Sequence, residues 1–228
     1  MLKTAELYDM SHTLAGAYLS GFEYPWQGLE GIKKADLTVA HIKELILALG
    51  PTLGEDYTEV SPTVWVHKTA AVAPTAFLGA PCIIGAGTEV RHCAFIRGSA
   101  LVGEGCVVGN SVELKNAILF DNVQVPHFNY VGDSILGYKS HMGAGSVTSN
   151  VKSDKTLVVV KNGEEQVPTG LKKFGAMLGD FVEVGCNSVL NPGTVIGPHS
   201  NVYPTSCVRG MVPANSIWKT GGIIVAKK

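Results

Sequence analysis

The sequence lacks an excess of charge of either sign and a long apolar run. Its 228 residues carry 18 lysines and arginines against 19 acidic residues, so no general electrostatic attraction to nucleic acid or an anionic membrane is expected. No apolar run approaches the roughly 20 residues that span a bilayer, and the opening stretch MLKTAELYDMSH lacks the apolar core of a signal peptide. We therefore expect a compact, soluble, cytoplasmic protein.

A pairing pattern among the cysteines is missing as well. Their number is odd and none forms a Cys-x-x-Cys pair, which excludes a disulfide framework and a zinc knuckle. His127 and His141 have no ligand spacing to a nearby cysteine, so no metal is expected. We expect reduced thiols at Cys82, Cys93, Cys106, Cys186 and Cys207.

The periods of an amphipathic helix and of a half-buried strand are absent, and a period of six takes their place. The apolar residues at this spacing are Val66, Val72, Leu78, Ile84, Val90, Ile96, Val102, Val108, Leu114 and Phe120. A Gly-rich sandwich would not hold one period over so many units. The repeat predicts an all-β fold, a hexapeptide β-helix in which three hexads close one triangular coil, with about six coils in all.

Two segments depart from the repeat and set the domain boundaries. Residues 1–60 contain a helical pattern at 35–50 that ends at Gly50 before a proline, which predicts a helical N-terminal cap on the coils. Residues 61–215 form the β-helix domain, and 216–228 a C-terminal tail. Within the domain, 151–173 is an excursion loop with a hairpin turn at Asn162-Gly163, a natural wall for a site between neighbouring prisms.

The repeat breaks at residues 123–137, VQVPHFNYVGDSILG, where the next aromatic or aliphatic position comes four residues late. This break predicts a bulge that carries His127 off the coil and leaves Tyr130 to restart the period. A histidine accepts a proton near neutral pH, so His127 is a candidate general base. The alternative is a structural histidine that caps the bulge.

Two cations are spaced to lie one above the other. Arg97 and Lys115 are eighteen residues apart, one full coil, and stacked cations repel unless an anion lies between them. The pair predicts a phosphate site; alternatively, Glu113 neutralises the pair on an ordinary surface. Backbone amides in GAGSVTSN, residues 143–150, could polarise a carbonyl or simply turn a corner of the coil.

Five motifs together resemble one known family. AFIRG, VGNSVELKNAI, PHFNYVGDSILG, GAGSVTSN and EVGCNSVLNPGTVIG are similar to the acetyltransferase half of bifunctional N-acetylglucosamine-1-phosphate uridyltransferase/glucosamine-1-phosphate acetyltransferases, above all to archaeal-type sugar-phosphate versions, over about residues 60–215. The resemblance implies a left-handed parallel β-helix, a homotrimer and acetyl-CoA bound in clefts between subunits. Residues 24–34, YPWQGLEGIKK, resemble the linker between the two halves.

The resemblance also implies residue roles. His127 would be the catalytic base toward the sugar amine, and the backbone amide of Ala144 would stabilise the oxyanion. Substrate binding would fall to Arg97, Glu113, Lys115, Tyr130 and His141, and acetyl-CoA binding to Ala144 and Asn150. At His141 the bacterial enzymes have an asparagine, and a lysine that they carry downstream of the position of Asn150 is unmatched, so the acceptor sugar stays open.

The uridyltransferase half has no counterpart, because its Gly-rich nucleotide loop and Rossmann-like domain are missing from these residues. The sequence thus predicts an acetyl-CoA-dependent N-acetyltransferase acting on an amino-sugar phosphate such as glucosamine 1-phosphate. One alternative is a non-catalytic subunit that binds a sugar phosphate or nucleotide sugar and partners a nucleotidyltransferase. Another is acylation with a longer chain or on oxygen.

Overall fold

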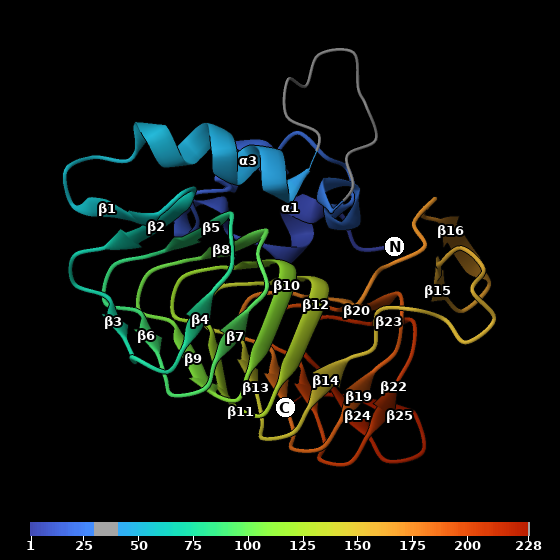
Figure 1. Cartoon of the computed structure of the whole chain (residues 1–228). Coiled ribbons are helices and arrows are strands. Elements are labelled where there is room, and N and C mark those ends of the chain that lie inside the picture. The colour runs from blue at the N-terminus through green and yellow to red at the C-terminus, as the bar shows by residue number, and fades with distance from the viewer. Residues whose placement is uncertain (30–40, 228) are drawn as a thin grey trace.

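The computed structural model describes residues 1–29 and 41–227, and its centre is a three-sided parallel β-solenoid (Figure 1). Short strands stack from coil to coil on three faces, which confirms the predicted β-helix class. Face 1 consists of β2 (Val64–His67), β5 (Cys82–Ile84), β8 (Ala100–Val102), the second halves of β10 (Glu113–Leu119) and β12 (Tyr130–Leu136), β17 (Ala176–Leu178), β20 (Thr194–Ile196) and β23 (Met211–Val212).

The other two faces have the same parallel order. Face 2 consists of β3 (Ala71–Val72), β6 (Glu89–Val90), β9 (Val107–Asn110), β11 (Gln124–His127), β13 (His141–Met142), β18 (Glu183–Val184), β21 (Asn201–Val202) and β24 (Ser216–Lys219). Face 3 consists of β4 (Phe77–Leu78), β7 (Phe95–Ile96), the first halves of β10 and β12, β14 (Val147–Thr148), β19 (Val189–Leu190) and β22 (Cys207–Val208).

The solenoid is longer than predicted. In the described chain face 2 alone has eight parallel strands, so the coils exceed the predicted six. The period of six does not reach the last coil, because β24 pairs with β21 at an offset of sixteen residues, Asn201 with Ile217, instead of eighteen. The antiparallel strands β1 (Tyr57–Ser61) and β25 (Ile223–Ala226) lie at the two ends of the stack, where open edges would otherwise invite pairing with other chains. Strands therefore continue past residue 215, the predicted domain boundary.

The predicted bulge at His127 is wrong. Gln124 pairs in register with Val107 below and His141 above, and His127 itself pairs with Asn110, so β11 is an ordinary rung of face 2. The coils here are shortened by one residue, since β10 and β12 bend around a corner at Asn116 and Asp133.

The inward column shows where the sequence pattern lost its register. Leu119 pairs with Val102 below it and with Leu136 above it, so Leu119 takes the position that the period assigns to Phe120. Phe120 is buried as well, which hides the one-residue shift in the sequence. The inward column continues without a break through Val125 and Val131, and Tyr130 is not part of it.

Two of the five cysteines belong to this interior. Cys82 occupies the small inward position next to Val64 and Ala100, and Cys106 is likewise buried. Burial raises the pKa of both thiols to about 12, so they stay protonated packing residues. Within the described residues all five cysteines are free thiols.

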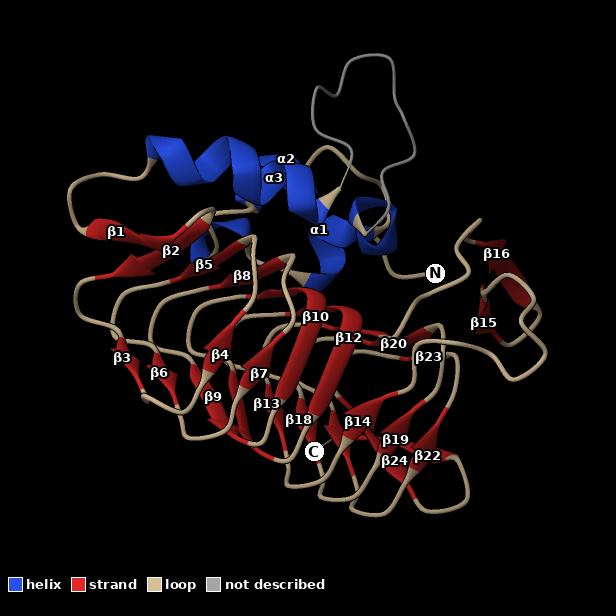
Figure 2. Ribbon diagram, viewed as in Figure 1, coloured by secondary structure: helices blue, strands red, loops and turns tan. Residues whose placement is uncertain are grey.

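The helical N-terminal segment is present, and it lies along face 1 instead of over the end of the stack (Figures 1 and 2). It comprises α1 (Thr4–Leu7), α2 (Gly16–Leu19) and α3 (Ile42–Leu49), with 3-10 turns at Met10–His12, Pro25–Gly28 and Gly50–Thr52. The part of the predicted helix at 35–40 and residues 30–34 of the linker-like stretch fall outside the described residues. No helix in the described chain is long and apolar enough to cross a membrane.

An apolar column on the outside of face 1 explains why the helices cover it. α3 packs on β8 and β10, and the 3-10 turn at Pro25–Gly28 packs on β12. The fully buried outward residues are Ile83, Leu101, Ile118, Ile135, Met177 and Val195. Burying such a column away from water is the main favourable term that holds the helices in place.

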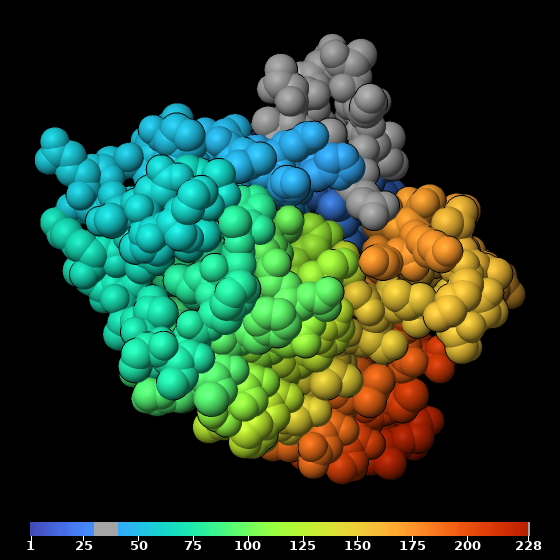
Figure 3. Space-filling model, viewed as in Figure 1, coloured from blue at the N-terminus to red at the C-terminus, as the bar shows by residue number. Residues whose placement is uncertain are grey.

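The excursion at 151–173 forms the predicted hairpin. Strands β15 (Val159–Asn162) and β16 (Glu165–Pro168) pair antiparallel, with Gly163 and Glu164 in the turn, one residue later than predicted. The hairpin projects beside β23 at the side of the solenoid (Figures 1 and 3).

A glycine under Pro126 offers a test of this coil-on-coil packing. A Cβ at Gly109 would lie 1.6 Å from the Pro126 carbonyl oxygen, so Gly109→Ala must push β11 away from β9. We expect a loss of about 1–3 kcal/mol or more in unfolding free energy, measured in urea. Gly54→Ala is the matched control, because its Cβ would meet nothing within 4 Å. Equal stabilities of the two variants would contradict the packing.

Candidate functional site

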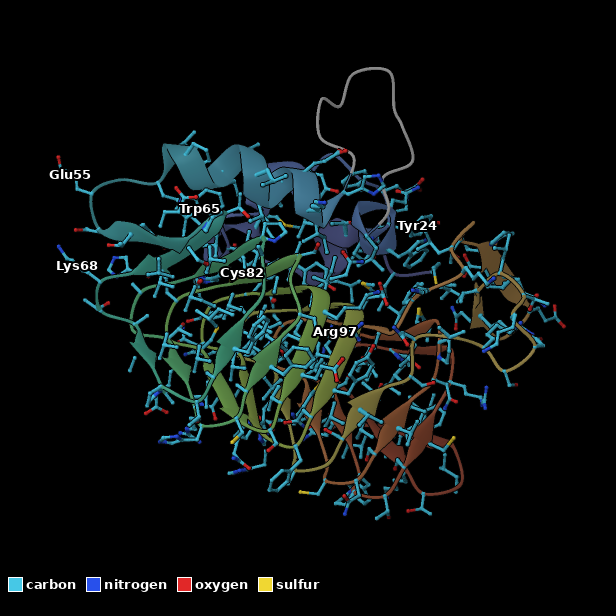
Figure 4. All side chains as sticks on the ribbon, viewed as in Figure 1. Tyr24, Glu55, Trp65, Lys68, Cys82 and Arg97 are labelled. Carbon is cyan, nitrogen blue, oxygen red and sulfur yellow. The ribbon has the colours of Figure 1, made fainter. Side chains whose placement is uncertain are left out.

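A cleft of about 550 Å³ opens at the corner between faces 3 and 1. Four described segments contribute residues to it: Leu29 after the Pro25–Gly28 turn, the start of α3, the corner of the solenoid, and the chain between β16 and β17. The titratable residues that line it are His41, Lys43, Arg97, Lys115, Asp133, Lys172 and Lys173. Figure 4 shows Arg97 beside the long strands β10 and β12. The cleft is therefore strongly cationic.

Arg97 and Lys115 lie on adjacent coils, as their spacing predicts. The Arg97 backbone N–H donates to the carbonyl oxygen of Leu114 at 2.8 Å, one residue before Lys115. Each cation has its own carboxylate partner: Arg97 Nη1 lies 2.8 Å from Glu113 Oε1, and Lys115 Nζ lies 2.9 Å from an Asp133 oxygen. Glu113 thus neutralises Arg97 alone and raises its pKa.

Asp133 organises this corner. Its carboxylate, with the side chain only 4% exposed, accepts hydrogen bonds from Lys115 Nζ at 2.9 and 3.0 Å, from Asn116 Nδ2 at 2.9 Å and from Asn150 Nδ2. Asn116 and Asp133 have φ of 50° and 49°, the left-handed region that these two residue types tolerate best. The shortened corner thereby fixes the Lys115 ammonium at the cleft wall.

Tyr130 joins the same cluster. Its Oη accepts a hydrogen bond from Asn150 Nδ2 at 3.1 Å. Burial, with the nearby charges of Asp133 and Glu113, raises the pKa of Tyr130, so the phenol keeps its proton and can donate it to an anion. The structure therefore brings together five of the predicted site residues: Arg97, Glu113, Lys115, Tyr130 and Asn150.

Of the predicted residues only Arg97 and Lys115 line the cleft itself, and the three not yet placed, His127, His141 and Ala144, lie outside both the lining and the cluster. His127 is exposed at the end of β11, and its carbonyl oxygen accepts the Gly145 N–H at 3.0 Å. His141 sits on face 2, where its Nδ1 lies 2.8 Å from Glu183 Oε2. The Ala144 N–H, at the corner after β13, has no hydrogen-bond partner among the described residues.

Sequence reasoning missed part of the cationic lining. Lys43, Lys172 and Lys173 belong to segments outside the repeat, which have no coil register from which a position could be read. Asn116 lies within the repeat. Its position directly after Lys115 was the one sequence signal that could have identified it as a lining residue. Asp133 stands near the predicted residues in the sequence, but only the structure shows its role.

A second cleft, of about 890 Å³, lies between the excursion hairpin and the last coils. Its lining combines Lys161 and Arg209 with Met211, Trp218 and Ile224. The excursion thus forms one wall of a cleft whose other wall belongs to the same chain. No group of three or more His, Cys, Asp or Glu side chains in the described residues could hold a metal ion.

Residues 94–212 match the family model of the GMPPB C-terminal domain, and the chain belongs to this family. A "Bifunctional sugar-1-phosphate nucleotidylyltransferase/acetyltransferase" of Sulfurisphaera tokodaii is 32% identical over 108 residues, 47% of this chain and 27% of the relative. A "Bifunctional protein GlmU" of Methanococcus aeolicus is 34% identical over 117 residues, 51% and 28% of the two chains. A GlmU of Clavibacter sepedonicus is 28% identical over 93% of this chain and 39% of the relative.

The chain therefore spans about a quarter to two fifths of the length of these relatives. It is a hexapeptide-repeat β-helix domain of the acetyltransferase type, related to the bifunctional sugar-1-phosphate nucleotidylyltransferases/acetyltransferases. This relationship agrees with the resemblance seen in the sequence motifs.

The two ion pairs of the cleft should differ in their contribution to stability. Asp133→Ala leaves the part-buried Lys115 ammonium and two amides without their acceptor, so we expect a loss of about 2–4 kcal/mol in unfolding free energy in urea. Glu113→Ala is the control, since the Arg97–Glu113 pair is 46% and 33% exposed and should contribute much less to stability. Similar losses for both variants would refute an organising role for Asp133.

Proposed function

We propose that this protein is an acetyl-CoA-dependent N-acetyltransferase whose acceptor is an amino-sugar phosphate such as glucosamine 1-phosphate. The observation that carries the proposal is the corner cluster, where Arg97 and Lys115 line one cleft and the Tyr130 phenol is linked to Lys115 through Asn150 and Asp133. Guanidinium, ammonium and phenol groups are donors suited to a phosphate. The acetyltransferase activity in the name of the Sulfurisphaera relative supports the reaction class.

Each chemical step has a candidate group. The sugar amine attacks the thioester carbonyl of acetyl-CoA, a C–N bond forms, and the C–S bond breaks to release the CoA thiol. A ring nitrogen of His127 would accept the proton that the amine loses and pass it to the departing thiolate, and the side chain is exposed and able to meet a substrate. The N–H of Ala144, which has no partner in the part of the chain that the structure describes, would stabilise the oxyanion of the tetrahedral intermediate.

The placement of His127 favours a shared site. His127, His141 and Ala144 lie apart from the lining of the corner cleft, with His127 only three residues before Tyr130. A homotrimer, in which acetyl-CoA lies between neighbouring prisms, would let a second copy complete the site around His127. His141, held by Glu183, then stands where it would select the acceptor sugar.

The catalytic assignment predicts the behaviour of two histidine variants. Wild-type protein should release thiol from acetyl-CoA when glucosamine 1-phosphate or galactosamine 1-phosphate is added, followed with a thiol reagent. His127→Ala should lower this rate by about 100-fold or more, because a general base contributes about 10²–10⁴-fold.

His92→Ala is the matched control and should keep the wild-type rate, since His92 is also exposed but its ring bonds to Thr75 and it is not part of the cleft lining. Absence of thiol release with every amino-sugar phosphate tried would refute the enzyme. An unchanged rate in His127→Ala would refute the base.

The shared site predicts an oligomer. Light scattering coupled to gel filtration should give three times the 24.0 kDa chain, or 72 kDa. A mass of one chain at concentrations where the protein is active would contradict a site formed between copies.

A second candidate function is supported by the separation of His127 from the lining of the corner cleft. The cationic cleft is complete in one chain without His127, so the domain could bind a sugar phosphate or nucleotide sugar without catalysis, as a subunit of a nucleotidyltransferase. This function predicts that calorimetry detects binding of a sugar phosphate but not of acetyl-CoA, and that a nucleotidyltransferase co-purifies with the chain. Tight binding of acetyl-CoA would exclude it.

A further inference from the structure

The corner cleft carries more positive charge than its own acidic groups balance. Five lysine and arginine side chains line it, and two of these are paired, Arg97 with Glu113 and Lys115 with Asp133. The other three, Lys43, Lys172 and Lys173, form no ion pair with any residue that the structure describes. Among the described residues the lining therefore keeps an excess of three positive charges.

The unpaired lysines converge because their backbones are anchored. Lys172 and Lys173 lie between two buried residues, Leu171 and Phe174, and the Phe174 N–H donates to the Asn150 carbonyl oxygen at 2.9 Å. The Phe174 ring packs against Trp26 with centroids 5.7 Å apart. Lys43 follows Ile42, which is fully buried in the first turn of α3. Like charges held at one cleft repel, which favours an anionic ligand between them.

The cations form two sets on different walls. Arg97 and Lys115 belong to the solenoid wall and are held there by hydrogen bonds, whereas Lys43, Lys172 and Lys173 come from the segments that cover it. A single phosphate group can be bound by the cations of one wall, which leaves the cations of the other wall without a ligand. The volume of about 550 Å³ lies in the range of roughly 300–1,000 Å³ found for sites that enclose a whole ligand of moderate size.

We infer that the ligand of this cleft carries two linked phosphoryl groups, as a sugar joined to a nucleoside diphosphate does. One phosphoryl group lies at Arg97 and Lys115, and the other at Lys172 and Lys173, with Lys43 beside them. This inference rests on the proposed function, because it takes the same cleft as the binding site. It changes the substrate class from a sugar monophosphate to a nucleotide sugar.

Three commercial probes separate the number of phosphoryl groups from the total charge. UDP-glucose carries two phosphoryl groups and about two negative charges, whereas glucose 1-phosphate and UMP carry one phosphoryl group and about the same charge. Calorimetry on the whole chain should find UDP-glucose bound at least about tenfold more tightly than either monophosphate, since one added charge-assisted contact suffices for that factor.

Variants locate the second phosphoryl group. Lys172→Ala/Lys173→Ala should weaken UDP-glucose binding by about tenfold or more and leave glucose 1-phosphate within about twofold. Lys155→Ala/Lys219→Ala removes the same charge outside the cleft and should leave all three affinities unchanged. The inference is overturned if UDP-glucose binds no more tightly than both monophosphates, or if the Lys172/Lys173 variant weakens all three probes equally.

The outcomes also separate this inference from the enzyme itself. A chain that prefers UDP-glucose but releases no thiol with any amino sugar supports the diphosphate site and refutes the transferase. A chain that releases thiol with glucosamine 1-phosphate and shows no preference for UDP-glucose refutes only the diphosphate site.

Discussion

Everything in this molecule depends on the parallel ladder that stacks one coil on the next. Because each strand bonds to the strands above and below it, every turn of the chain must bring an apolar residue back over the one beneath. Rungs such as Ile84, Val102 and Leu119 meet that demand and form the interior. The same demand sets functional geometry, since Lys115 follows Leu114 onto the coil above Arg97.

The corner cluster arises where a coil is one residue short. The chain turns within β10 and β12 through left-handed residues, and an aspartate at such a position can direct its carboxylate back onto neighbouring side chains. Asp133 does so and holds Lys115, Asn116 and Asn150 together. A departure from the regular repeat thus produces the densest polar network beside the cleft.

The covering of face 1 completes the site from outside the repeat. The apolar outward column draws the N-terminal helices onto this face, and the same packing carries Lys43 to the cleft rim. Phe174, anchored by Trp26, brings Lys172 and Lys173 to the same cleft. Hydrophobic burial therefore determines where the three unpaired lysines lie.

Sequence periodicity was sufficient to predict the solenoid and the stacking of Lys115 on Arg97, and the Asn162-Gly163 turn signal predicted the hairpin. It failed at the shortened coils, because Phe120 is itself apolar and buried, and a shift of one residue leaves the pattern of residue types almost unchanged. The segments without a repeat have no register, so neither the course of the helices along face 1 nor the position of Lys172 was predictable.

The most direct test of the phosphate site in the corner cleft is a crystal structure of the chain with glucosamine 1-phosphate bound. We expect a phosphate within hydrogen-bonding distance of Arg97 and Lys115 in the corner cleft, on the side of the Tyr130 hydroxyl. A sugar phosphate bound only on face 2, or only in the cleft beside Lys161 and Arg209, would contradict it.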